Sequence, residues 1–157
     1  MGLKEGTTKT RRHEGPKRLV ILGWCLLLLG VVSGQQPAFT TVAKGDASGQ
    51  QLGKQVTVRT AAEWKALWKE HAPTEKMPAV DFSRDMVVGI FLGTKPSTGH
   101  EVEIVAVRMQ EKDLIVEYVE KQPARGTMAA QILTEPFHLV TVAKHAGAVR
   151  FLHVPAK

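Results

Sequence analysis

Ser97 and His100 are the pair whose residue types and spacing come nearest to catalytic chemistry. They lie three positions apart in the segment GTKPSTGH, where a serine nucleophile and a histidine base would be neighbours. A serine hydrolase also needs an acid that orients the base and an oxyanion hole. No G-x-S-x-G motif surrounds Ser97, so the sequence predicts turn residues here rather than a hydrolase site.

Two further chemistries have little support in the sequence. Gly93 and Gly99 lack the Walker A spacing, and no Lys-Ser or Lys-Thr pair follows Gly99 to bind phosphate. Glu101 and Glu103 are two apart in an alternating segment, which predicts the solvent-facing side of a strand. We therefore predict that the chain is not an enzyme and has no cofactor.

The histidines leave one alternative open. None of those that follow residue 34 forms an H-x-H, H-x-x-x-H or H-E-x-x-H motif with another. A metal or small-ligand module would have to assemble them from distant strands. They are His71, His100, His138, His145 and His153.

The N-terminal residues have the composition of a targeting segment. Basic residues precede Leu19–Val32, an uncharged apolar run that is shorter than the ~20 residues of a membrane span. Its length suits a secretory signal core, and Val32-Ser33-Gly34 supplies small residues for cleavage. We predict that residues 1–34 are a signal peptide or, if uncleaved, a hydrophobic anchor formed by residues 19–34. The chain would then be exported to a bacterial envelope or secreted.

Most of the net charge of +6 lies in this N-terminal segment, which holds 6 Lys/Arg and 2 Asp/Glu and so contributes +4. The remaining +2 gives no concentrated basic face, so the sequence argues against nucleic-acid binding. The single cysteine, Cys25, also lies in the segment and follows a bulky Trp24, unlike a lipoprotein signal. The rest of the chain must fold on its hydrophobic core alone.

One helix is predicted after a polar tether at residues 35–51, which holds at most a short strand near Phe39–Ala43. Thr60 and Glu63 have the spacing of a capping box, and Pro73 ends the pattern. An apolar stripe at helical spacing follows the cap, and we interpret its tryptophans as core rather than as a ligand platform. The stripe consists of Trp64, Leu67, Trp68 and His71.

The remainder of the domain, residues 52–157, is predicted to consist mainly of strands joined by short turns. This order favours antiparallel pairing. The fold class is therefore α+β and β-rich, a small sheet or sandwich of about six strands with one early amphipathic helix. The predicted strands are Val56–Val58, Met86–Leu92, Glu101–Val107, Leu114–Val119, Phe137–Ala143 and Val149–Val154.

Three connections contain Pro and Gly residues that restrict or permit particular backbone shapes: Gly93–His100, Lys121–Thr127 and Thr134–Phe137. They either only turn the chain or form a stiff surface for protein recognition. We expect Gly93–His100 to be a hairpin bend with an exposed tip. The candidate partner-binding residues are Thr94, Lys95, Pro96, Ser97, Thr98, Gly99, His100, Pro123, Arg125, Gly126, Pro136 and Phe137.

The segment VDFSRDMVVGIFLGTKPSTGHEVEI at Val80–Ile104 resembles the core of the PrcB C-terminal domain family. The segments AAEWKALWKEHAP, EYVEKQPARGT and TEPFHLVTVAK occur in the family's order, so the resemblance covers about Val58–Val154. The family is named for an accessory subunit of a bacterial surface protease complex, which supports the protease's stability or maturation. The resemblance implies a non-enzymatic role, and it carries no catalytic residues onto this chain.

A shorter similarity concerns two loops. PSTGH at Pro96–His100 is similar to the N-P-T-T-G-[FY] loop of chagasin-type cysteine protease inhibitors, and Pro136-Phe137 to their late R-P-[WF] element. Lys95, His100 and Glu135 depart from that pattern, and the match is short and consists mainly of turn residues.

The expected function is therefore that of an exported accessory domain which binds a partner protein, with an envelope protease as the expected partner. One alternative is a protease inhibitor that uses Gly93–His100 as a wedge. The histidine-based metal or small-ligand module is the other.

Overall fold

The computed structural model describes residues 1–2 and 38–156. The signal peptide or anchor predicted for residues 1–34 therefore lies almost entirely outside the described residues. Among the residues that are described, no helix has the length and apolar character needed to cross a membrane.

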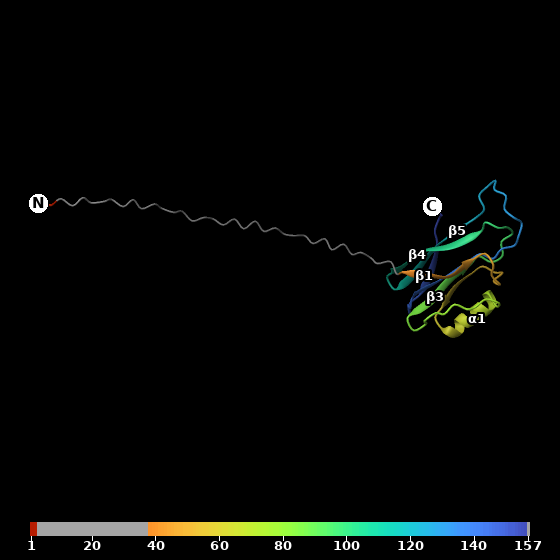
Figure 1. Cartoon of the computed structure of the whole chain (residues 1–157), viewed down its shortest axis with the longest axis horizontal. Coiled ribbons are helices and arrows are strands. Elements are labelled where there is room, and N and C mark those ends of the chain that lie inside the picture. Colours follow the sequence, from red (N-terminus) through yellow and green to blue (C-terminus); the bar gives the residue numbers. More distant parts are fainter. Residues whose placement is uncertain (3–37, 157) are drawn as a thin grey trace. The chain divides into compact units, whose positions relative to one another are not determined.

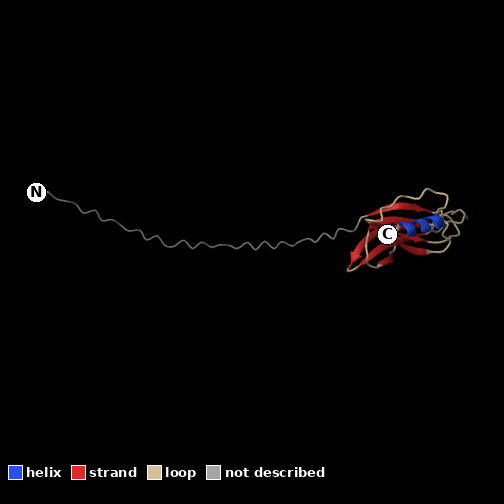
Figure 2. Cartoon of the chain, turned by 90° about the horizontal axis from the view of Figure 1, so that it is seen from below, coloured by secondary structure: helices blue, strands red, loops and turns tan. Residues whose placement is uncertain are grey.

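The described strands form two sheets, with one helix on the outer face of the larger sheet (Figures 1 and 2). The four-stranded sheet has the order β1-β6-β3-β2, and all its neighbours are antiparallel. The three-stranded sheet has the order β4-β5-β7, in which β4 and β5 are antiparallel but β5 and β7 are parallel. The bounds are β1 Phe39–Gly45, β2 Lys54–Val58, α1 Ala61–His71, β3 Asp85–Phe91, β4 Glu101–Gln110, β5 Asp113–Lys121, β6 Phe137–Ala143 and β7 Val149–His153.

This architecture confirms the predicted fold class of a small, β-rich α+β sandwich with one early helix. Residues 38–156 form seven strands rather than about six, because β1 belongs to the larger sheet. The pairing is largely antiparallel, as predicted, and the β5–β7 pair, whose strands are not consecutive in the sequence, is parallel. It arises because β7 returns beside β5 after the chain has crossed to the other sheet to form β6.

Two apolar cores hold the three layers together. Between the sheets, alternating residues of β3, β4, β5 and β6 pack into one cluster that includes Met86, Ile104 and Val140. Between α1 and the four-stranded sheet, a second cluster includes Trp64, Trp68 and Leu139. Figure 1 shows the resulting order, with β3 lying between α1 on one side and β4 and β5 on the other.

The helix begins and packs as its sequence predicts. The Thr60 hydroxyl accepts from the Glu63 backbone N–H, and the Glu63 carboxylate accepts from the Thr60 backbone N–H, which completes the capping box. Trp64 and Trp68 are 1% and 5% exposed, so both are core residues as interpreted. Their indole N–H groups donate to the carbonyls of Pro78 and Glu75, which fastens the chain that leads to β3.

The sequence predicts a tether at residues 35–51, but the structure places Phe39–Gly45 in the sheet as β1, paired with β6. The short strand expected near Phe39–Ala43 is thus present and longer. The polar residues after it are also bound into the domain, since Gly49 N–H donates to the His71 carbonyl and Gln50 is buried. Polarity was misleading here because β1 is an edge strand, and an edge strand tolerates exposed threonines.

The prediction of a hairpin bend at Gly93–His100 is wrong. The strands on either side of it, β3 and β4, belong to different sheets, so the segment is a connection between layers. Both strands are apolar toward the shared core, and a pattern of apolar residues does not distinguish pairing in one sheet from packing between two.

Candidate functional site

The connection Gly93–His100 is held by hydrogen bonds along most of its length. Lys95 and Thr134 exchange both backbone hydrogen bonds, at N···O distances of 2.7 and 3.0 Å, in an isolated antiparallel bridge. Thr98 N–H donates to the Ala130 carbonyl, and Ala130 N–H donates to the Thr98 hydroxyl. The segment is therefore ordered by a partner distant in sequence rather than by a turn of its own.

The start of this connection is packed against the loop before β2. Gly93 has a φ of 69°, a left-handed conformation that favours glycine. A Cβ at Gly93 would lie 2.6 Å from the Gly53 nitrogen and 2.7 Å from the Gln51 carbonyl oxygen. Thr94 N–H then donates to the same Gln51 carbonyl. We call the surface formed by residues 51–53, 93–100 and 122–136 the loop end.

The loop end exposes large apolar side chains that sequence reasoning did not select. Leu52 is 81% exposed, Met128 is 104% exposed, and Ile132 and Leu133 are 61% and 67% exposed. Three of these four side chains come from residues 128–133, and exposed apolar surface is typical of interaction sites when such side chains adjoin one another. The available signal was the run MAAQIL, whose apolar residues fit neither a helix nor a strand pattern.

The predicted partner-binding residues are divided by the structure into exposed and buried groups. Ser97 is 8% exposed and Phe137 is 7% exposed, and Pro136 is also buried, so these three do not present side chains to a partner. Phe137 begins a central strand and packs against the rings of Phe91 and His71. The exposed members are Thr94, Pro96, Gly99, Arg125 and Gly126, and the half-buried members are Lys95, Thr98, His100 and Pro123.

The Lys121–Thr127 connection meets Gly93–His100 at Gly99. A Cβ on Gly99 would lie 3.2 Å from the Pro123 ring, which shows how closely the two segments approach. A groove of about 320 Å³ separates them further along, and Met128 lies on its wall. All three predicted loops are thus neighbours in space, as a shared recognition surface requires, because Thr134 of the third loop forms the backbone bridge to Lys95.

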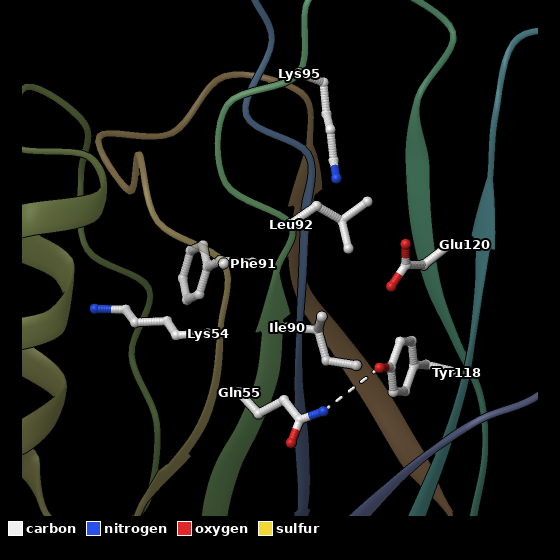
Figure 3. A pocket seen from close by; sticks show the side chains of 9 residues that line it. Lys54, Gln55, Ile90, Phe91, Leu92, Lys95, Tyr118 and Glu120 are labelled. Atoms are coloured by element: carbon white, nitrogen blue, oxygen red, sulfur yellow. Dashed lines mark hydrogen bonds between the residues drawn. The ribbon is translucent and has the colours of Figure 1, made fainter.

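A second groove, of about 320 Å³, opens between the two sheets beside the loop end (Figure 3). Its lining includes Ile90 and Phe91 of β3 and Leu92, which directly follows β3. Tyr118 and Glu120 of β5 also line it. Lys95 and Glu120 point into the groove, with the Leu92 side chain between them. Among residues 38–156 neither charge forms an ion pair.

The two buried histidines, His71 and His138, each form side-chain hydrogen bonds of their own. His138 is 3% exposed; its Nδ1 accepts from Ile104 N–H at 2.8 Å, so its Nε2–H donates to the Thr41 hydroxyl at 2.9 Å. Burial and the nearby Lys44 ammonium lower the pKa of His138 to about 4, which keeps the ring neutral. The pKa of His71 is also lowered by burial. Each ring therefore fastens structural elements to one another.

The described residues gather no set of three His, Cys, Asp or Glu side chains that could hold a metal ion. Glu101 and Glu103 both form ion pairs with Lys121, and Glu103 also pairs with Lys44. These lysines lower the pKa of the Glu103 carboxyl through hydrogen bonds and charge. The two carboxylates lie on the face of β4 opposite Val102 and Ile104, as predicted.

The fold and the site together define a small sandwich domain with a hydrogen-bonded, partly apolar loop end. Residues 86–143 match the family model described as PrcB C-terminal, which confirms the resemblance to that family. The match runs from β3 to the end of β6 and so includes Gly93–His100 and the whole segment 122–136. No curated protein and no solved structure gives a significant match to the chain.

Proposed function

We propose that this chain is a non-enzymatic accessory domain that binds an envelope protease through its loop end. The observation that carries the proposal is the combination, within the matched residues, of a hydrogen-bonded loop pair with exposed apolar side chains. A surface that is ordered before binding loses little conformational entropy when it binds. The family's name points to a protease complex as the source of the partner.

Export is part of this proposal. The basic residues followed by the apolar run Leu19–Val32 support it, since they have the order of a secretory signal or a short anchor. Either form would place the folded domain outside the cytoplasm, where a surface protease is found.

The experiment is affinity capture from native envelope extract with the tagged chain as bait, followed by identification of the captured proteins by mass. The proposal expects a protease that is recovered with its activity intact or extended in lifetime. Recovery of a protease whose activity falls in proportion to added chain would instead support an inhibitor. Repeated capture without any protease would contradict both functions.

A further inference from the structure

The outer edge of β2 is unpaired. In the four-stranded sheet β2 pairs with β3 alone, and no other hydrogen bond between backbone groups reaches Lys54–Val58 within residues 38–156. An unpaired edge presents backbone N–H and C=O groups to which another extended chain can bind. Natural proteins protect such edges when they are not used.

Two of the other edges, β1 and β4, have an interrupted register, whereas β2 and β7 do not. The register of β1 is broken by an irregularity between Thr41 and Ala43, and that of β4 by one between Ile104 and Ala106. Bulges of this kind twist an edge away from further pairing. The β2–β3 register runs without interruption from Lys54 to Val58.

The groove of Figure 3 lies beside the first residues of this edge. Gly53, Lys54 and Gln55 form one side of it, and Tyr118 and Glu120 form the other. A single long hydrogen bond, 3.4 Å from Gln55 Nε2 to the Tyr118 hydroxyl, spans the two sides. A strand added to β2 would therefore lay every second side chain toward this groove, since side chains alternate between the faces of a strand.

The groove also specifies what those side chains should be. Leu92 offers an apolar contact, Lys95 attracts an acidic side chain, and Glu120 disfavours a second acid. Lys54 lies across the Phe91 ring, 5.7 Å from its centroid, and is already paired with Glu70. Lys95 is thus the cation that is free to select a ligand here.

We propose that the edge of β2 binds an extended segment of the partner protein by strand addition. The segment carries an apolar side chain against Leu92 and an acidic side chain toward Lys95. This inference rests on the proposed function, because Lys95 also belongs to the loop end and would connect the two surfaces. Backbone pairing supplies affinity in this mode of recognition, and the side-chain positions supply specificity.

A second copy of this chain fits the edge less well than an acidic partner does. The strand and its neighbours read KQVTVR at residues 54–59, with a cation at each end and no acidic residue. Two such edges would bring cations together and would leave Lys95 without a counter-charge. The occupant is therefore a strand from a different protein.

The test uses the full chain and a displayed library of random linear peptides as the probe. Enriched peptides are expected to alternate between apolar and polar residues, as a strand does, and to share an acidic residue. Their affinity should fall about tenfold in Lys95→Glu, and Glu120→Lys should shift selection toward additional acids. Lys76→Glu, a reversal at an exposed lysine far from β2 in the sequence, serves as the control and should bind normally. Bound peptide should also slow amide hydrogen exchange in β2.

Three results would overturn the inference. They are a library without enriched peptides, peptides that bind Lys95→Glu as well as the control, or β2 amides protected by self-association in the absence of peptide. The proposed function is tested separately. That test measures how much protease the chain captures, and how much of this capture depends on the loop-end side chains of Ile132 and Leu133. Protease capture with no peptide bound at β2 would leave the proposed function standing while removing this inference.

Discussion

At the scale of single residues, the buried polar side chains serve to join elements. His138 connects β6 to β1 through Thr41 and to β4 through the Ile104 N–H, so one ring links both sheets. His71 connects the end of α1 to the Ser48 hydroxyl. His71 and His138, which the sequence offers only as scattered candidate ligands, therefore join structural elements through hydrogen bonds.

The lowered pKa of His138 predicts a pH-dependent stability. Because its folded pKa of about 4 lies below the ordinary 6.5, the unfolded chain binds the proton first as the pH falls. This stabilising contribution is complete above about pH 6.5 and is lost between pH 6.5 and 4, to a total of about 3 kcal/mol. The lowered pKa of His71 acts in the same direction. Urea unfolding measured across this range should show the decline.

His138→Gln separates this cause from general acid destabilisation. In this variant the free energy of unfolding should depend much less on pH, whatever its absolute value. His153→Gln, at an exposed position, should keep the pH dependence of the wild type. An unchanged slope in His138→Gln would show that His138 does not carry the effect.

Two glycines give a matched comparison of backbone strain. Gly93 and Gly126 have φ values of 69° and 82°, but only Gly93 has neighbouring backbone atoms where a Cβ would lie. Gly126→Ala should therefore cost about 1–2 kcal/mol, the ordinary penalty of a left-handed residue. Gly93→Ala should cost clearly more, because Gly53 or Gln51 must also move. Equal losses in thermal or urea unfolding would contradict the packing described for Gly93.

At the scale of elements, α1 could be predicted nearly completely from the sequence. Its cap, its apolar stripe and its end are all local signals, and Trp64 and Trp68 are buried as their spacing predicts. Most strands were also located correctly because each has a continuous or alternating apolar pattern. Their partners could not be predicted, since β3 followed by β4 reads like a hairpin whether or not the two strands share a sheet.

The capping box predicts a defined cost for Thr60→Ala. Removing the hydroxyl leaves the Glu63 N–H without its partner, so the free energy of unfolding should fall by about 1 kcal/mol. Thr74→Ala, at an exposed position in the turn after the helix, provides the control and should change it little. A loss at Thr74 equal to that at Thr60 would mean that the cap does not stabilise α1.

At the scale of the whole molecule, the candidate surface was only partly visible in the sequence. Pro and Gly residues marked Gly93–His100 and Lys121–Thr127, and the structure brings these two segments together at Gly99 and Pro123. Pro136 and Phe137 carry the same signals but are buried, because the next residues form a central strand. The exposed leucines and Ile132 were missed, since exposure depends on what packs nearby and not on local pattern.

The most direct measurement is the amount of protease captured by the chain and by the double variant Ile132→Ser, Leu133→Ser. The account predicts that this variant unfolds like the wild type but recovers little protease, because both side chains are exposed and belong to the loop end. A control double variant on the three-stranded sheet, Met109→Ser, Leu152→Ser, also removes two exposed apolar side chains. This control should capture the protease as the wild type does. Equal recovery by all three proteins would contradict the assignment of the loop end as the partner-binding surface.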